Sequence, residues 1–366
     1  MNSSRDDRPR RRQWLSRFLA LGVGTLLCLV GLEAVLRTLP VSDALRTTAV
    51  NAENPIIRFE PGREITWSRD WDFSLVNQVR FNNFGFVSDF DYDPDATSPL
   101  LAVIGDSYVE ALMVPFGETC AGRLGTHLEG RTRVYALGMS GAPLSQYLAF
   151  AEYARDTFRP DAVAIVVISN DYDESLLQYG RKPGMHQFRE QGDGSLALER
   201  SDLTRGRLYP LARRIALARY LAVNLDILNL GRNVRRAIHG PLDRRGREGD
   251  SKRAVAAFLD SLPAAAGLAP ERITFVVDGI RPGLYGDDEG RHPESSYEGV
   301  MRRHFMSNAA RRGYEVIDMQ PLFVDHYRVH GTRFEWAHDG HWNALGHSVC
   351  ADALRRSLAP SNGADG

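Results

Sequence analysis

Cysteine is scarce in this chain of 366 residues, which contains only Cys28, Cys120 and Cys350. So few cysteines exclude the dense disulfide framework that stabilises small secreted domains. Cys28 lies in an apolar run, whereas Cys120 and Cys350 fall on the first and last predicted helices of one domain. These helices could be neighbours, and a Cys120–Cys350 disulfide could form in an oxidising compartment, but we expect two buried free thiols. No base or motif beside a cysteine supports thiol catalysis.

An excess of charge of either sign is also lacking. The formal net charge is −1, and residues 18–366 carry 39 basic and 44 acidic side chains. Because proteins that bind nucleic acid carry a basic surplus that neutralises phosphates, no nucleic-acid partner is expected. The sequence contains no internal repeat. Its length fits one large α/β domain with insertions, or two small domains.

Long apolar runs are lacking except at residues 18–36, where only Glu33 interrupts the run. Nineteen helical residues, at about 1.5 Å each, nearly span the core of a bilayer. Five arginines within residues 8–17 precede the run, which predicts that residues 1–17 are cytoplasmic and that the rest is exported. A cleaved signal peptide is the alternative, but no small-x-small site follows, and the two leucines before Cys28 do not fit a lipoprotein signal. We predict a single-pass anchor in the inner membrane, with the domain in the periplasm or outside the cell.

Short apolar runs are typical of strands that are buried on both faces of a parallel sheet. Segments with helical spacing separate them, such as residues 116–128 after the first run. This alternation predicts an α/β fold, with a doubly wound parallel sheet and right-handed crossovers. The five predicted strands cover residues 100–104, 133–137, 161–169, 273–277 and 314–319.

Polar or glycine-rich signals follow the predicted strands. Ser107 comes after the first strand, on a predicted connecting loop, Gly141 after the second and Asn170 after the third. Asp339 and His341 follow the last strand after a loop. Because ligands bind beyond the carboxyl ends of the strands in open α/β sheets, we expect these residues to meet at one edge.

This set predicts nucleophilic catalysis by Ser107. A serine hydroxyl becomes a good nucleophile only when a base within hydrogen-bond reach takes its proton, and His341 is the candidate base. Asp339, two residues earlier, would hold the imidazole in the productive tautomer. The amides of Ser107 and Gly141 and the side chain of Asn170 would stabilise the oxyanion that forms when an ester carbonyl is attacked.

The residues and their order resemble the SGNH or GDSL hydrolases, whose four sequence blocks contain Ser, Gly, Asn and His. The blocks here are Gly105-Asp106-Ser107, Ser140-Gly141, Asn170-Asp171 and Asp339-Gly340-His341. The resemblance covers residues 81–358. It implies a three-layer flavodoxin-like fold and ester hydrolysis, or acyl transfer, through an acyl-serine intermediate. No cofactor is predicted.

Two positions depart from the family pattern. Many members space the acid and the base as Asp-x-x-His, whereas Asp339 and His341 are spaced as Asp-x-His. Where a glycine often stands two residues before the third-block asparagine, this chain has Ile168. The first departure affects the choice of the acid, and the second affects local backbone packing. Neither removes a catalytic group.

Other interpretations of these residues remain. His338, Asp339 and His341 could form part of a metal site, but the sequence offers no ligand framework elsewhere, and we predict no metal. His347 is an alternative base, although we expect it on the final helix, packed or solvated. Asn343 is expected to cap that helix.

The remaining polar residues near the strand ends are expected to have structural roles. Asp106 would stabilise its turn through hydrogen bonds. The others are expected on solvated loops or surface turns, with pocket lining as the alternative for the last two: Asp171, Asp173, Asp278 and Arg281.

The predicted strands and the anchor define the domain organisation. Residues 37–80 are a polar linker that leads into a domain of residues 81–358. Residues 170–272 separate the third and fourth strands, more than one crossover helix needs, so we predict a helical insertion at about 175–260. Within it, residues 208–230 have helical periodicity and are expected to pack on the domain. A lid or a surface lying on the membrane is the alternative.

Two segments are predicted to be mobile. Residues 232–253 are basic and poor in apolar side chains, and this composition is typical of a flexible excursion. Residues 359–366 are predicted to be a disordered tail. Neither segment carries a candidate catalytic residue.

The resemblance and the anchor predict an exported serine esterase that acts on acyl esters. The location makes O-acetyl groups on a cell-surface saccharide the expected substrates. An O-acetyltransferase that modifies an exopolysaccharide or cell-wall glycan would use the same residues. A noncatalytic scaffold or polysaccharide-binding protein would retain only the fold.

Overall fold

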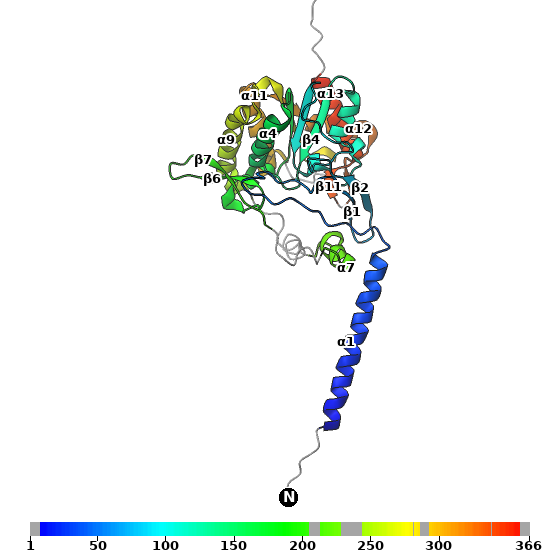
Figure 1. The fold of residues 1–366 in the computed structure, drawn as a ribbon. Coiled ribbons are helices and arrows are strands. Elements are labelled where there is room, and N and C mark those ends of the chain that lie inside the picture. Colours follow the sequence, from blue (N-terminus) through cyan, green and yellow to red (C-terminus); the bar gives the residue numbers. More distant parts are fainter. Residues whose placement is uncertain are drawn as a thin grey trace, which may run out of the picture. The chain divides into compact units, whose positions relative to one another are not determined.

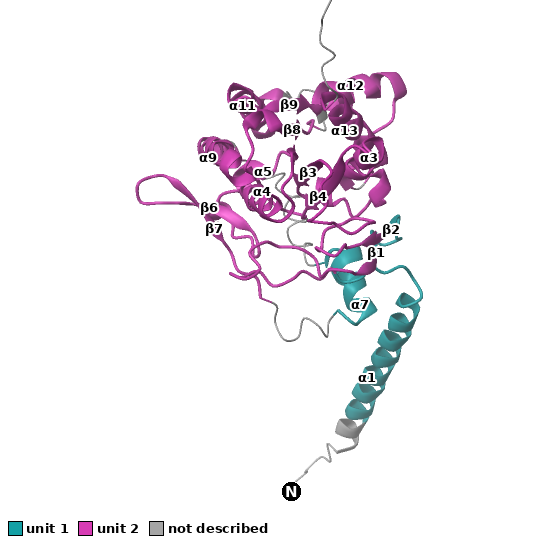
Figure 2. Ribbon diagram, turned by 45° about the horizontal axis from the view of Figure 1, so that its top comes forward, with its two compact units in different colours: residues 1–44, 66–76, 206–235 teal, residues 45–65, 77–205, 236–366 magenta. Residues whose placement is uncertain are grey.

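The computed structural model describes residues 8–204, 213–227, 244–280, 282–285, 293–337 and 339–358. The chain divides into two compact units (Figure 2). Unit 1 comprises residues 1–44, 66–76 and 206–235, and unit 2 comprises residues 45–65, 77–205 and 236–366. The predicted tail lies outside the described residues, as do Arg281 and His338.

Unit 2 is built on a five-stranded sheet in which all neighbouring strands are parallel. The strand order is β4-β3-β5-β8-β9, which confirms the doubly wound fold and corresponds to the flavodoxin-like order 2-1-3-4-5. All residues of β3 and β8 are buried, as expected for strands covered on both faces. The strands are β3 (Leu100–Gly105), β4 (Arg133–Gly138), β5 (Ala162–Val167), β8 (Ile273–Val277) and β9 (Glu315–Asp318).

Helices cover both faces of this sheet and complete the predicted three layers (Figure 1). One layer contains α4 (Leu144–Phe158), α9 (Glu248–Ala266) and α11 (Tyr297–Arg311). The other contains α3 (Cys120–His127), α12 (Met319–His330) and α13 (Ala344–Ser357). The chain changes face at the switch point between β3 and β5, where a ligand site is expected in such sheets.

The remaining strands and several of the helices are short. Two antiparallel pairs are β6 (His186–Glu190) with β7 (Leu196–Arg200), and β10 (Glu335–Trp336) with β11 (Asp339–Trp342). A further two-stranded sheet contains β1 (Glu64–Arg69) and β2 (Leu75–Arg80). The short helices are α2 (Ser107–Glu110), η1 (Phe116–Glu118), α5 (Asp171–Glu174), η2 (Leu177–Tyr179), η5 (Arg245–Arg247), η6 (Pro270–Arg272), α10 (Pro282–Tyr285) and η7 (Pro293–Ser295).

Cys120 and Cys350 form a disulfide, so the expectation of two free thiols is wrong. Helices α3 and α13 pack against each other on one face of the sheet, and this packing brings the two Cα atoms to 5.7 Å. The bond therefore joins α3 to α13, the last helix of the sheet domain, across a sequence separation of 230 residues.

The segment between β5 and β8 differs from the predicted helical insertion. It contains the β6–β7 hairpin, which the sequence prediction misses. The predicted flexible excursion overlaps the start of α9, which already begins at Glu248. Of the predicted helix over residues 208–230, the described part contains α7 (Ala216–Arg219) and a π-helix, η3 (Tyr220–Asn224).

The predicted linker also carries more structure than expected. Residues 45–65 belong to unit 2, where Val50, Ile56 and Phe59 are buried. Thr47 and Phe59 form an antiparallel bridge within this stretch. Its scattered apolar residues therefore pack as part of the core, although they show no regular period.

Unit 1 combines the apolar N-terminal helix with two later segments. Helix α1 (Arg8–Leu36) contains residues Gln13–Leu36, a candidate membrane span by length and composition. A small core is formed by Leu36, Val41 and Ala216, against which Phe73 and Tyr220 also pack. Glu33 lies near the end of α1, and its carboxylate accepts hydrogen bonds from the amides of residues 216 and 217, at 3.0 and 2.8 Å.

Candidate active site

Ser107 is the first residue of helix α2, directly after strand β3. The prediction that it lies on a connecting loop is wrong, because Asp106 caps a helix that begins there. The Asp106 carboxylate accepts a hydrogen bond from the Tyr108 amide at 2.9 Å, and it also accepts one from the Ser107 hydroxyl at 3.2 Å. This confirms the structural role expected for Asp106. The short helix points the serine side chain toward the carboxyl edge of the sheet.

His341 and Asp339 meet Ser107 at this edge. The Nε2 atom of His341 lies 2.8 Å from the Ser107 Oγ atom, and its Nδ1 atom is hydrogen-bonded to the Asp339 carboxylate. The same carboxylate accepts the His341 amide at 2.9 Å. Both residues lie on strand β11, where alternate side chains share a face. The Asp-x-His spacing therefore suits a strand, and the three side chains form one hydrogen-bonded chain.

Aromatic packing holds the histidine strand in place. The hydroxyl of Tyr108 donates to the Gly340 carbonyl at 2.8 Å, and its ring lies 5.1 Å from the rings of both His341 and Trp342. The Trp342 indole donates to the Asp278 carboxylate at 2.9 Å. Tyr108 and Trp342 were not among the residues predicted from the sequence, although Tyr108 directly follows Ser107.

The loop after β4 carries Gly141, which has a φ of +75°, a conformation that favours glycine. Its neighbour Ser140 donates a hydrogen bond to the carboxylate of Glu110, the buried last residue of α2. A Cβ atom on Gly138 would lie 2.3 Å from the Glu110 amide nitrogen, so glycine allows the strand end to approach α2 closely. These contacts fix the loop that presents the Gly141 amide.

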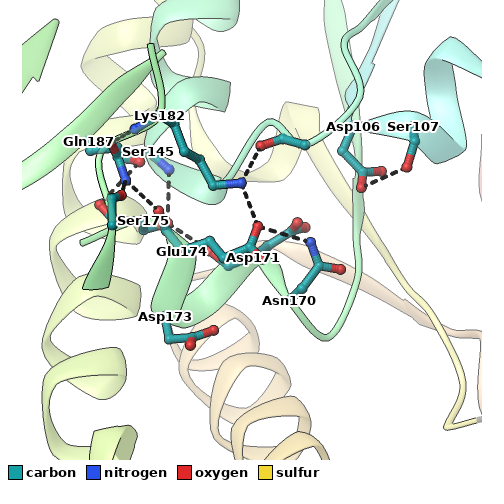
Figure 3. Close-up of polar contacts among 12 residues, drawn as sticks. Asp106, Ser107, Ser145, Asn170, Asp171, Asp173, Glu174, Ser175, Lys182 and Gln187 are labelled. Carbon is teal, nitrogen blue, oxygen red and sulfur yellow. Dashed lines mark hydrogen bonds and ion pairs between the residues drawn. The ribbon is translucent and has the colours of Figure 1, made fainter. Parts of the chain in front are cut away.

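Asn170 follows β5 and is the residue directly before helix α5. Its Nδ2 atom donates to the Glu174 carboxylate at 3.3 Å. Lys182 contacts the same carboxylate at 2.6 Å and donates to the Gly141 carbonyl at 2.8 Å (Figure 3). The Glu174–Lys182 pair thus connects the two residues predicted as oxyanion donors. Sequence reasoning found neither member of the pair, because neither lies in a motif.

Burial perturbs the pKa values of several carboxyl groups near Ser107. It raises the pKa of Asp106 to about 6 and the pKa of Glu110 to about 7. It also raises the pKa of Asp171 well above its usual range, although this carboxylate accepts hydrogen bonds from the Ile168 amide and the Tyr147 hydroxyl, each at 2.9 Å. Buried carboxyl groups with perturbed pKa values are typical of functional sites.

Two loop predictions are therefore wrong. Asp171 is fully buried, and Asp173 is also fully buried and pairs with Arg247 at 2.7 Å. Both carboxylates lie on α5, where they face the interior instead of the solvent. Asp278 lies beside the site and binds the indole of Trp342, so the surface-turn prediction is wrong for this residue.

Two further predictions concern the final helix. Asn343 caps α13, and its side chain accepts the amides of residues 345 and 346 at 3.0 and 3.1 Å, as predicted. His347 is buried on α13, where its Nδ1 atom accepts the Cys120 amide at 3.2 Å. Burial lowers the pKa of His347 to about 3, which leaves it neutral and packed, as expected for a structural histidine.

A cavity of about 830 Å³ opens over the serine. Its walls include Ser107, His341, Gly141, Asn170, Lys182 and Arg302. Among the residues that the structure describes, no group of three His, Cys, Asp or Glu side chains is arranged to hold a metal ion. Ser107 and His341 therefore line the same cavity as the two candidate oxyanion residues, Gly141 and Asn170.

Comparisons with known proteins give likenesses to solved structures. No protein-family model matches this sequence, and no curated protein matches it. A lipolytic G-D-S-L family protein from Veillonella parvula is 12% identical, with a TM-score of 0.41, and the match covers 72% of this chain and all of that one. A variant of the acetyl xylan esterase Axe2 from Geobacillus stearothermophilus is 16% identical, with a TM-score of 0.40 and coverages of 72% and 96%.

Proposed function

We propose that this protein is an SGNH-type serine esterase, with Ser107, His341 and Asp339 as its catalytic residues. The observation that carries the proposal is the continuous chain from Ser107 Oγ to His341 Nε2, at 2.8 Å, and from His341 Nδ1 to the Asp339 carboxylate. In the first half-reaction, Ser107 Oγ attacks the ester carbonyl carbon while His341 takes the hydroxyl proton. His341 then gives that proton to the leaving alcohol as the ester C–O bond breaks.

Water completes the cycle. His341 takes a proton from a water molecule, whose oxygen attacks the acyl-serine carbonyl, and the proton returns to Ser107 Oγ as the acid leaves. Asp339 keeps the imidazole oriented and stabilises the imidazolium that forms in both halves. The amides of Ser107 and Gly141 and the side chain of Asn170 are proposed to receive the oxyanion, and one such donor typically contributes on the order of 10²-fold to 10³-fold in rate.

The cavity suggests a polar carrier for the acyl group. Its walls carry charged side chains, among them Glu174, Lys182 and Arg302, which favour a carrier rich in hydroxyl groups over a long lipid chain. A volume of about 830 Å³ gives room for more than a short acyl group. We therefore propose O-acetyl esters on a cell-surface saccharide as the substrate class.

Export and anchoring belong to the same proposal, with α1 as an uncleaved inner-membrane anchor and residues 1–17 in the cytoplasm. Cleavage after α1 would remove Leu36 from the core of unit 1 and would take the Glu33 carboxylate away from the amides of residues 216 and 217, which favours retention of the helix. The Cys120–Cys350 disulfide supports an oxidising compartment such as the periplasm.

Purified full-length protein in detergent tests the proposal. We expect it to release p-nitrophenol from p-nitrophenyl acetate and acetate from an acetylated xylo-oligosaccharide. Ser107→Ala should reduce both rates by at least about 10⁴-fold. Ser195→Ala, in the exposed β6–β7 turn, is the matched control and should keep the parental rate.

Two outcomes would change the proposal. Equal turnover by the parental protein and Ser107→Ala would refute the serine mechanism and favour a noncatalytic protein. Serine-dependent appearance of the acetyl group on an added unacetylated oligosaccharide, in place of free acetate, would identify an O-acetyltransferase.

A further inference from the structure

Unit 1 exposes large apolar side chains in the part that follows the membrane helix. Trp71 is 70% exposed although a tryptophan normally buries most of its ring. Further apolar residues in this unit are between 38% and 43% exposed: Leu39, Ile215, Val223, Leu225 and Ile227. We call these six residues the apolar collar.

A tight turn presents Trp71 to the outside. Asp70 and Phe73, on either side of residues 71 and 72, have φ values of +67° and +57°, which are unusual for residues with a Cβ atom. The Ser74 hydroxyl stabilises the turn by donating to the Asp70 carboxylate at 2.8 Å. The turn packs the Phe73 ring against the small core of unit 1 and leaves the Trp71 ring exposed. Backbone strain that exposes a tryptophan favours a functional role for that side chain.

Direct contacts tie this turn and helix α7 to the end of α1. The Glu33 carboxylate accepts the first amides of α7, and the Tyr220 hydroxyl donates to the Trp71 carbonyl at 2.8 Å. Tyr220 also packs against the core that contains Leu36, the last residue of α1. Figure 2 shows α7 beside the C-terminal end of α1 within unit 1. The collar is therefore continuous with the candidate span.

We propose that the apolar collar lies in the headgroup region of the bilayer leaflet from which α1 emerges, so that its partner is a phospholipid surface. Tryptophan is enriched at this depth, where its ring meets acyl chains and its indole N–H meets water. Apolar side chains on short helices beside a membrane span bind the interface in the same way. The inference rests on the proposed anchor, and it adds a second membrane contact on the exported side.

Fluorescence of Trp71 in proteoliposomes tests the collar. The full-length chain carrying Trp14→Phe, which removes the tryptophan inside α1, is compared with the Trp14→Phe, Trp71→Phe double variant. The difference between their spectra isolates Trp71. Phosphatidylcholine brominated near the top of its acyl chains should reduce this difference signal roughly twofold, whereas aqueous iodide should have little effect.

A second tryptophan provides the control. Val329 is 75% exposed on α12, and Val329→Trp in the double-variant background should be quenched by iodide and not by brominated lipid. Iodide quenching of Trp71 without lipid quenching would overturn the collar, as would equal lipid quenching at positions 71 and 329. Failure of the anchor itself is distinguishable, because the protein would then not float with vesicles after an alkaline wash.

Discussion

Ser107 lies between two regions that are held in place by different means. On the histidine side, one hydrogen-bonded chain and the packing of Tyr108 and Trp342 fix the geometry. On the donor side, charged or titratable side chains hold the loop of Gly141 and the side chain of Asn170. The geometry of the histidine side therefore depends on the alignment of its hydrogen bonds, whereas the geometry of the donor side depends on charged groups.

This contrast has consequences for mutation. In the proposed mechanism, a broken link in the histidine chain removes proton transfer, so large losses are expected there. Changes on the donor side would shift the position or the electrostatic potential of the proposed oxyanion donors, and such effects are graded. Substitutions in the two regions should therefore differ in the size of their effect on kcat. They should also differ in whether the effects of two substitutions are coupled and in how the effects depend on pH.

Asp339→Asn should have the largest effect among the supporting residues. An asparagine amide that donates to Nδ1 would favour the tautomer with its proton on Nε2, which cannot take the serine proton. We expect kcat to fall by about 10⁴-fold with little change in KM. Measurement of p-nitrophenyl acetate hydrolysis checks this value, with circular dichroism as the test of folding. A loss smaller than tenfold in a folded variant would contradict the role of Asp339.

Asn170→Ala should have an intermediate effect. It removes one proposed oxyanion donor while the serine and the histidine remain aligned, so we expect kcat to fall by about 10²-fold. Asn308→Ala, on the outer helix α11, is the matched control and should retain the parental kcat. An unchanged kcat in Asn170→Ala would exclude this side chain as a donor.

Lys182 and Glu174 should show coupled effects. Lys182→Met leaves the Glu174 carboxylate near the forming oxyanion without its cation, and we expect kcat to fall about tenfold, since one such charge costs on the order of 1–2 kcal/mol. Glu174→Gln should cost less, and the double variant should be more active than Lys182→Met alone. A double-mutant cycle of kcat at low and high salt measures this coupling. Strictly additive losses would argue against a charge-balancing pair.

The sequence predicts much of the histidine side because its signals are local. Apolar residues mark the strands of the sheet, the first three blocks follow β3, β4 and β5, and the last block follows β9 after helix α12. Asp339 and His341 are two residues apart on one strand, so their joint orientation follows from the period of a strand. The fold and the Ser–His–Asp arrangement could therefore be predicted from short stretches of sequence.

The donor side depends on contacts that no local pattern encodes. Lys182 reaches the Gly141 carbonyl across 41 positions of sequence, from a segment without a motif. The sequence predicts a solvated loop for the acidic residues of α5, whereas the structure shows that Asp171 is buried. The Cys120–Cys350 bond likewise depends on the packing of two helices that are far apart in the sequence.

Glu110→Gln should have the smallest effect on kcat at neutral pH and a clear effect on stability. Burial raises the pKa of Glu110 to about 7, above the value of about 4.5 expected in the unfolded chain. The native state therefore retains a proton that the unfolded state releases between these values. The contribution of Glu110 to stability is complete below about pH 4.5 and is lost as the pH rises through about 7, a change of roughly 3 kcal/mol in the free energy of unfolding.

Glutamine resembles the protonated acid and can still accept the Ser140 hydroxyl. Glu110→Gln should therefore lose less stability than the parental protein between pH 5.5 and pH 8, as measured by urea unfolding at each pH. Asp106 and Asp171 also have raised pKa values, so part of the decline should remain. Glu118→Gln, which removes an exposed carboxylate on η1, should follow the parental curve. If the stability of Glu110→Gln also followed the parental curve, Glu110 would not titrate in this range. The donor loop would then be held by the geometry of its hydrogen bonds, as His341 is, and not by a titrating charge.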